Sequence, residues 1–172
     1  ARMTAEIMVK LEEVFLREKP SGVLIYGDTN TTLAAALVAV KLQIPIAHVE
    51  AGPRIYDINT PEEINRIVAD HAARLRFCPD MASVENLKLE NISKGVHLTG
   101  DLMFDSYRHF LPRAKHLSTV LERTGLAGRE YALMTIHRPN NTDDSIAIER
   151  LVRLCQQAPL PILFAVHPRT KA

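Results

Sequence analysis

The sequence has no tryptophan, only two cysteines, and no apolar run near the roughly 20 residues that a membrane-spanning helix needs. Its formal net charge is +1, and no basic block supplies the clustered positive charge typical of nucleic-acid-binding proteins. Cys78 and Cys155 lie far apart without CxxC spacing, which favours reduced cysteines. The segment Ala1–Lys19 is charged throughout, unlike a secretory signal peptide. These absences favour a cytoplasmic globular protein with no nucleic-acid and no membrane partner.

Several common cofactor and nucleophile motifs are also missing. The sequence contains neither the GxGxxG pattern of dinucleotide-binding folds nor the GxxxxGK[ST] pattern of a P-loop. It has no GxSxG nucleophile motif, and its His, Cys and acidic spacings match no zinc signature. The function must therefore be sought in other residues.

Two short apolar runs form the centre of the pattern that is present. Val23–Tyr26 and Ile44–Val49 are each bounded by Gly, Pro or polar residues, which is typical of buried strands. The Ala- and Leu-rich segment Thr31–Leu42 between them predicts a helix. A strand, a helix and a strand in this order predict a βαβ unit with two parallel strands.

The same alternation continues along the chain and predicts a Rossmann-like, doubly wound parallel α/β sheet. A helix that begins after a capping hydroxyl of Thr60 is expected, as is an interruption at Pro112 in the helical pattern from Leu102 to Arg123. The remaining expected helices are 3–18, 82–90 and 143–157, and the remaining strands are 75–78, 96–99, 131–136 and 161–166.

The linker Gly125–Arg129 predicts two domains. Residues 1–124 are expected to be the C-terminal part of a first Rossmann-like domain, and residues 125–172 the start of a second, nucleotide-binding one. Two strands and one helix cannot bury both faces of the second sheet, and the first expected helix has no strand before it. We therefore expect the fold to be incomplete at both ends. The alternative is a complete small domain with a C-terminal addition.

Acidic residues follow both strands of the central unit. Asp28 and Glu50 each come directly after a strand, and parallel strands place such residues at the edge where α/β sheets bind ligands. Asp28 could instead cap the following helix, whereas Glu50 has no capping role and would cost stability unless paired or hydrated. Glu62 opens the next helix, so three carboxylates suited to proton transfer are expected around one rim.

Two further groups have competing interpretations. Glu62, Asn65 and Arg66 share one helix face, either as an exposed Glu–Arg pair worth a few tenths of a kcal/mol or as a carboxylate aimed at the rim by Arg66. His48, inside a strand, is typical of a hydrogen-bonded core histidine rather than a metal ligand.

His137 and His167 each follow a strand of the second half. With the neighbouring Arg138 and Arg169 they could face a phosphate or pyrophosphate.

These residues give the sequence a resemblance to the non-hydrolysing UDP-N-acetylglucosamine 2-epimerases, carried by six stretches in order across essentially the whole chain. They are GDTNTT (27–32), HVEAGPR (48–54), PEEINR (61–66), TGDLMFDS (99–106), IHR (136–138) and VHPRT (166–170). The resemblance implies two Rossmann-like domains of the glycosyltransferase-B type, a homodimer, and a nucleotide sugar in the cleft.

The resemblance also implies an isomerase that converts UDP-GlcNAc to UDP-ManNAc by elimination and re-addition of UDP, without a cofactor or metal, in the cytoplasm for polysaccharide biosynthesis. Its catalytic residues match Asp28, Glu50, Glu62 and His137. Glu62 and Asp28 are candidates for the base and the acid, in either order, and His137 or Arg138 for stabilising the leaving UDP. The expected substrate contacts are Asp28, Glu50, Arg54, Arg66, His137, Arg138 and His167.

The sequence departs from the family pattern at several places. Pro53 stands where the family usually has Leu, and His137 begins HRPNN where a sequence such as HRAEN is usual. The N-terminal GTRPE loop and the later uridine-binding segment are absent, so we expect this chain alone to be inactive or weakly active. The alternatives are a glycosyltransferase of the same fold, a non-catalytic nucleotide-sugar-binding paralogue, and a hydrolysing relative that releases free ManNAc.

Overall fold

The computed structural model describes residues 1–137 and 139–171. Packing divides the chain into two compact units, unit 1 (Ala1–Phe110) and unit 2 (Leu111–Ala172). The domain boundary that the sequence predicts between residues 124 and 125 stays a prediction.

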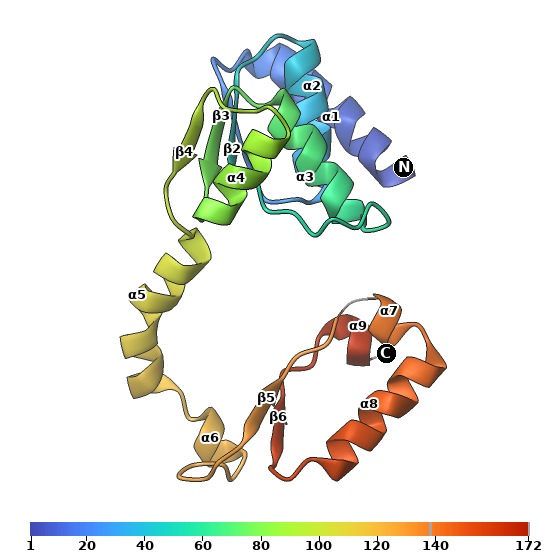
Figure 1. Ribbon diagram of the computed structural model, residues 1–172, viewed down its shortest axis with the longest axis vertical. Helices are drawn as coiled ribbons and strands as arrows, with labels where there is room; N and C mark the ends of the chain where they lie inside the picture. Colours follow the sequence, from blue (N-terminus) through green and yellow to red (C-terminus); the bar gives the residue numbers. More distant parts are fainter. Residues whose placement is uncertain (138, 172) are drawn as a thin grey trace. The chain divides into compact units, whose positions relative to one another are not determined.

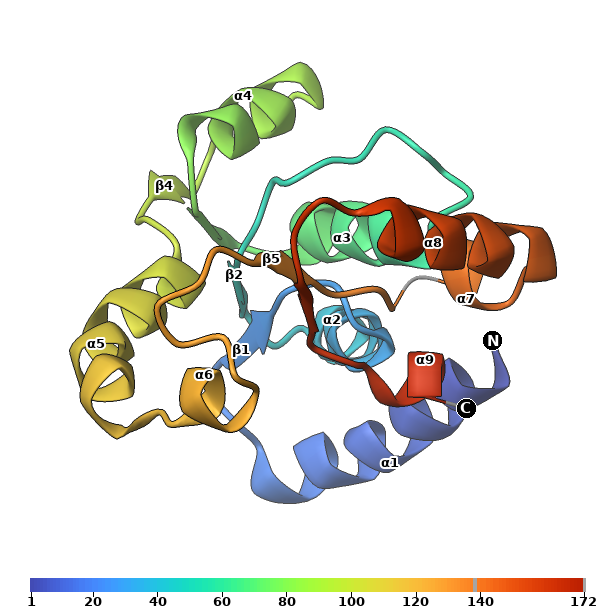
Figure 2. The same cartoon turned by 90° about the horizontal axis from the view of Figure 1, so that it is seen from below.

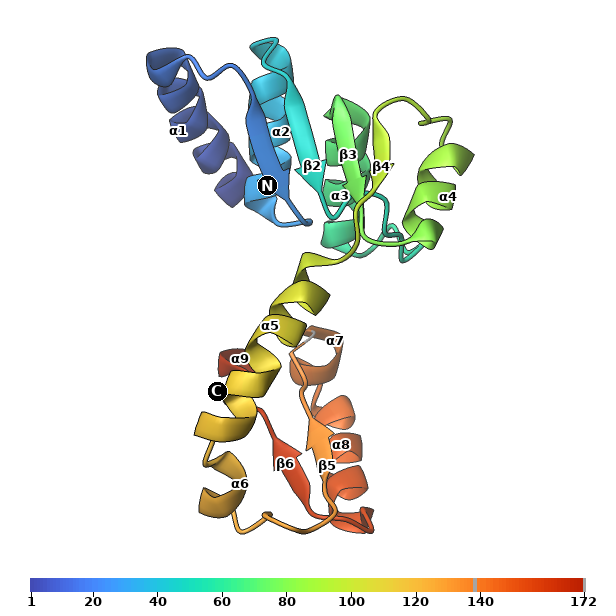
Figure 3. The same ribbon diagram turned by 90° about the vertical axis from the view of Figure 1, so that its left-hand side faces the viewer.

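Unit 1 alternates helices and strands along the chain (Figure 1). Its four strands form one parallel sheet in the order β1-β2-β3-β4, which confirms the predicted parallel α/β class (Figure 3). The elements are α1 (Arg2–Glu18), β1 (Val23–Tyr26), α2 (Asn30–Lys41), β2 (Ile46–Val49), α3 (Pro61–Ala72), β3 (Leu75–Cys78), α4 (Met81–Leu89), β4 (Val96–Leu98) and the start of α5 (Leu102–Leu117).

The core of unit 1 lies between one face of the sheet and helices α1, α2 and α3. Figure 2 shows α2 and α3 on the same side of β1 and β2. Small alanines let these helices approach the sheet closely, and they pack with Ile25 of β1 and Ile46 of β2, two buried residues of neighbouring strands. Side chains of the opposite face, such as Leu24 and Tyr26, are exposed.

The helix starts in unit 1 differ in how they are capped. Thr29 accepts the N–H of Thr32, and Asp80 accepts the N–H of Ser83, a bond that lowers the pKa of Asp80. The expected cap by Thr60 is wrong, because its hydroxyl donates to Asp57 (3.3 Å) and accepts no N–H of α3. Asp57, which also accepts from Asn59, draws that hydroxyl away from the helix end.

The sequence predicts a kink or two helices between Leu102 and Arg123, and two helices are found, but the break does not lie at Pro112 as expected. Helix α5 continues through Pro112 and ends at Leu117, before the short helix α6 (Val120–Arg123). A proline removes only its own N–H from the helical bonds, and its cost of about 3 kcal/mol can be outweighed by the turns around it. The break falls instead at Ser118, whose hydroxyl accepts the N–H of Val120 and so competes with the helical pattern.

Unit 2 contains a second, two-stranded parallel sheet. Here β5 (Ala132–Met134) and β6 (Ile162–Phe164) are joined through α8 (Ser145–Gln157), which Asp144 caps by accepting the N–H of Ile146. The short helices α7 (Pro139–Thr142) and α9 (Pro168–Lys171) follow the two strands. No helix formed by residues 1–137 and 139–171 combines the length and the apolar character needed to cross a membrane.

Candidate active site

Asp28 lies at the carboxyl end of β1, in a loop held by helix α3. It does not cap α2, because Thr29 occupies that position. Asn65 donates from Nδ2 to the backbone oxygen of Asp28 (2.8 Å), and Arg66 donates from Nη2 to its carboxylate oxygen Oδ2. Two adjacent residues of the PEEINR stretch therefore fix both the backbone and the side chain of Asp28.

Glu50 follows β2 in a left-handed conformation, with φ at 67°. Such a conformation is strained for a residue with a side chain and persists only where the surroundings impose it. Its side chain is exposed, and its Oε2 atom lies 3.4 Å from where a Cβ on Gly27 would be. Gly27 directly precedes Asp28, and its N–H donates to the backbone oxygen of Val49 (3.0 Å), which directly precedes Glu50. The loops that carry the two carboxylates are therefore in contact at one edge of the sheet.

The two glutamates that open α3 have different environments. Glu62 is exposed and makes no hydrogen bond or ion pair with any described residue. Glu63 is only 3% exposed, and its carboxylate accepts the N–H groups of Ile55 and Tyr56, each at 2.9 Å. Glu63 therefore holds the loop that connects β2 to α3, a role that sequence reasoning missed.

Arg66 does not form the expected pair with Glu62. Its guanidinium pairs with Asp28 instead, because α3 packs beside the carboxyl end of β1. Arg66 thus supports Asp28, a predicted catalytic carboxylate, and not Glu62, which the helical spacing suggested as its partner.

The side chain of Arg54 is only 1% exposed. It donates from Nε and Nη2 to the two carboxylate oxygens of Glu90 (2.6 and 2.8 Å) and from Nη1 to Asp70 (2.8 Å). Burial alone would lower the pKa of Arg54, but the hydrogen bonds to Glu90 and Asp70 outweigh it and raise the pKa. In this structure the guanidinium faces protein carboxylates, and its predicted contact with substrate remains untested.

His48 is fully buried, and both its ring nitrogens have oxygen partners. Nδ1 lies 2.7 Å from Oδ1 of Asp70, and Nε2 lies 2.8 Å from the carbonyl oxygen of Gly27. This arrangement confirms the interpretation of His48 as a hydrogen-bonded core histidine.

Asp70 was not singled out from the sequence. It lies seven positions after Glu63, two helical turns along the same face of α3, and both are buried. That spacing of two acidic residues facing one loop is the signal that could have found them.

In unit 2 the two predicted histidines lie side by side. The rings of His137 and His167 are 5.7 Å apart between centroids and tilted by 43°. Thr170 donates to the backbone oxygen of Ile136, which ties the segment after β6 to the segment after β5. Arg138 lies outside the described residues.

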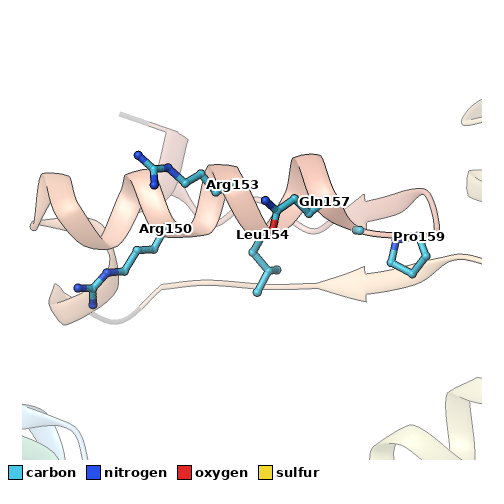
Figure 4. A pocket seen from close by; sticks show the side chains of 6 residues that line it. Arg150, Arg153, Leu154, Gln157 and Pro159 are labelled. Carbon is cyan, nitrogen blue, oxygen red and sulfur yellow. The ribbon is translucent and has the colours of Figure 1, made fainter.

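A shallow concavity of unit 2 is not lined by these histidines. It is formed by α8 and the turn that leads into β6, as Figure 4 shows with Arg150 and Arg153 pointing to opposite sides of the helix. This turn precedes β6, whereas His167 follows it, so the turn lies at the opposite end of that strand from His167.

Both cysteines are free thiols, as expected. Cys78 is fully buried in β3, and burial raises the pKa of its thiol to about 11.

These observations define a Rossmann-like parallel α/β protein with carboxylates at the carboxyl edge of its first sheet. The family model described as UDP-N-acetylglucosamine 2-epimerase matches residues 1–172. The chain therefore belongs to the UDP-N-acetylglucosamine 2-epimerase family, a family of isomerases, as the sequence resemblance predicted.

Individual relatives agree with this assignment. The chain is 42% identical over 169 residues to a UDP-N-acetylglucosamine 2-epimerase homolog of Methanococcus maripaludis, covering 98% of this chain and 47% of the relative. It is 40% identical over 177 residues to the UDP-2,3-diacetamido-2,3-dideoxy-D-glucuronate 2-epimerase of Pseudomonas aeruginosa, covering 99% and 48%.

A solved structure matches the fold as well. The Methanocaldococcus jannaschii UDP-GlcNAc 2-epimerase, solved in complex with UDP-GlcNAc and UDP, superposes with a TM-score of 0.85 at 36% identity, covering 98% of this chain and 48% of that one. The chain thus spans about half the length of the relatives that it matches.

Proposed function

We propose that the whole protein is a non-hydrolysing UDP-N-acetylglucosamine 2-epimerase, which interconverts UDP-GlcNAc and UDP-ManNAc. The observation that carries this proposal is the hydrogen bond from the N–H of Gly27 to the backbone oxygen of Val49 (3.0 Å), because Asp28 and Glu50, which directly follow these two residues, then lie at one edge of the sheet. Ligands of open α/β sheets bind at this edge. Glu62, exposed at the start of α3, is a third carboxylate available for the reaction.

The reaction needs one proton removed and one returned. A carboxylate takes the hydrogen from C2 as a proton, the C2 electron pair forms the C1=C2 double bond, and the C1–O bond to UDP breaks. UDP then adds again to C1 while C2 receives a proton on the opposite face. Asp28 and Glu62 are the proposed acid and base, in either order, and general acid–base catalysis is worth on the order of 10²–10⁴ in rate.

Unit 2 would supply the groups that stabilise the departing diphosphate. His137 and His167 lie together after neighbouring parallel strands, and a protonated histidine is a donor to phosphate oxygens. Arg138 follows His137 directly in the sequence and is proposed as the second cation. This assignment needs no cofactor or metal.

The whole protein is also proposed to be a cytoplasmic homodimer that provides a sugar nucleotide for polysaccharide biosynthesis. The free cysteines and the family assignment support this setting. Because the chain spans about half the length of its relatives, the 172-residue chain alone is expected to be inactive or weakly active.

A second substrate is favoured by one observation. The Pseudomonas aeruginosa relative, whose name gives UDP-2,3-diacetamido-2,3-dideoxy-D-glucuronate as substrate, is 40% identical to this chain. That substrate would need the same proton transfer at C2, so the carboxylate roles would be unchanged. Offering both UDP-sugars to the whole protein, at equal concentration, would decide between them by the ratio of kcat/KM.

Incubation in deuterated water tests the reaction class. Epimerisation replaces the C2 hydrogen of recovered UDP-sugar with deuterium, whereas a glycosyltransferase leaves that hydrogen in place. Glu62→Gln should keep nucleotide-sugar binding and lose the exchange, and Glu13→Gln, an exposed glutamate of α1, should keep both. A wild-type protein that binds but neither exchanges nor epimerises would be the sensor-like paralogue, and free ManNAc among the products would indicate the hydrolysing reaction.

A further inference from the structure

Asp70 occupies a central position in unit 1 that the proposed mechanism does not use. It lies near the C-terminal end of α3 and is 0% exposed. Its carboxylate accepts from the backbone N–H of Gly52 (3.1 Å) and from Arg54 Nη1 (2.8 Å), and it faces His48 Nδ1 at 2.7 Å. One buried side chain therefore contacts β2 and two points of the loop that follows β2.

The first connection leads to Asp28. A carbonyl oxygen only accepts hydrogen bonds, so His48 Nε2 must donate to the carbonyl of Gly27. The contact between Asp70 and the opposite ring nitrogen fixes the orientation of the imidazole. Asp70 thereby orients, through His48, the peptide that joins Gly27 to Asp28.

The second connection leads to Glu50. Asp70 accepts the N–H of Gly52, and Asn86 donates to the carbonyl oxygen of the same glycine (3.0 Å). A Cβ on Gly52 would lie 2.4 Å from the backbone oxygen of Ser83, so the chain is tightly enclosed here. These contacts fix the segment directly after Glu50 and help to hold the left-handed conformation that Glu50 adopts.

We infer that Asp70 is a positioning residue, which sets the relative placement of the Asp28 and Glu50 carboxylates through His48–Gly27 on one side and Gly52 on the other. This inference rests on the proposed epimerase function for its effect on rate. Misplacing a reacting group by about 1 Å can cost on the order of 100-fold in rate, so the hydrogen bonds of Asp70 should matter more for kcat than for KM.

Three variants of the whole protein separate positioning from general stability. Asp70→Ala removes all three contacts, with His48, Gly52 and Arg54. Asp70→Asn keeps an oxygen for Gly52 and Arg54 and offers an N–H to His48, but removes the negative charge. Glu90→Gln removes the other carboxylate of Arg54 and does not touch Gly27, Gly52 or His48.

The expected result is a dissociation between rate and stability. Asp70→Ala should lower kcat by about 100-fold with KM changed by less than about threefold, and Asp70→Asn should recover most of the loss. Glu90→Gln should lower the thermal midpoint about as much as Asp70→Asn yet keep kcat within about twofold. The inference would be overturned if Asp70→Asn lost as much kcat as Asp70→Ala. It would also be overturned if Glu90→Gln lost as much kcat as Asp70→Ala.

Two further measurements cover the cases in which Asp70→Ala does not fold or the wild type is inactive. His48→Asn keeps an amide toward Asp70 but is too short to reach Gly27, so it should lower kcat at least about 10-fold. The longer side chain in His48→Gln should keep kcat within about threefold of the wild-type value. Backbone amide shifts of Asp28 and Glu50 should change in Asp70→Ala or His48→Asn and not in Glu90→Gln. If the wild type shows no C2 exchange, the epimerase proposal fails while these shifts still decide the positioning role; unchanged shifts would overturn it.

Discussion

Arg66 donates a hydrogen bond from Nη2 to the carboxylate of Asp28, across 38 residues of sequence. The neighbouring Asn65 bonds the backbone of the same aspartate. Helix α3 therefore supports a carboxylate that belongs to the loop after β1, and this relationship determines how substitutions in the PEEINR stretch should behave.

Arg66→Met is expected to release the Asp28 carboxylate while keeping the bulk of the side chain. Losing a partly buried, charge-assisted bond should cost about 1–3 kcal/mol of stability, and kcat should fall on the order of 10- to 100-fold as Asp28 loses its fixed orientation. Arg17→Met, which removes only the exposed pair with Glu18, should cost less than about 1 kcal/mol and leave kcat unchanged. Steady-state kinetics and denaturant unfolding of the whole protein measure both effects, and an unchanged kcat in Arg66→Met would contradict the assignment.

Gly27→Ala tests the contact between the two loops. Gly27 has a φ of 60°, so alanine should cost about 1–2 kcal/mol from backbone strain alone, and its new Cβ would meet Oε2 of Glu50 at 3.4 Å. Gly125→Ala is the matched control, because Gly125 has a φ of 68° and nothing within 4 Å of the added Cβ. Both variants should lose similar stability, but only Gly27→Ala should lower kcat. Equal activity of the two would show that the approach of the added Cβ to Glu50 does not affect the rate.

Much of the fold could be predicted because its strands are short apolar runs ended by polar or turn residues. The strands Val23–Tyr26 and Leu75–Cys78 have the predicted bounds. The second strand begins at Ile46 rather than Ile44, since Pro45 lacks an N–H for the ladder, although its carbonyl accepts from Val23. The local sequence pattern was sufficient to predict these strands because apolar runs and turn residues determine where they begin and end.

The support of the site could not be predicted because it depends on contacts between distant segments. Arg54 pairs with Glu90, 36 residues away, and nothing in the local pattern around either residue indicates the other. Asp70 appears in the sequence as one more polar residue of an amphipathic helix, and only the packing of α3 against β2 makes it a buried acceptor for Gly52 and Arg54 and a neighbour of His48. The carboxylates could be found from strand ends, whereas the residues that hold them could not.

The buried thiol of Cys78 should make stability depend on pH in alkaline solution. Burial raises the pKa of Cys78 from 9.0 to about 11, so between these values the unfolded chain loses the thiol proton while the folded chain keeps it. The unfolded state then binds fewer protons, and the free energy of unfolding must fall as pH rises from about 9 to 11. Denaturant unfolding across this range should show the decline, and Cys78→Ala should flatten it. An equal slope in the variant would assign the decline to other groups.

Replacement by glutamine should have different effects at Glu62 and Glu63, the two adjacent glutamates of α3. Glu63→Gln leaves one carboxamide oxygen where two carboxylate oxygens accept the N–H groups of Ile55 and Tyr56, so the loop before α3 should open more often. Hydrogen exchange at these two amides should accelerate by about 10-fold, corresponding to about 1.4 kcal/mol. Glu62→Gln should leave this exchange unchanged and lower the rate of deuterium entry at C2 of the UDP-sugar. If Glu63→Gln instead removed C2 exchange with the loop still protected, Glu63 rather than Glu62 would be the carboxylate that touches the sugar.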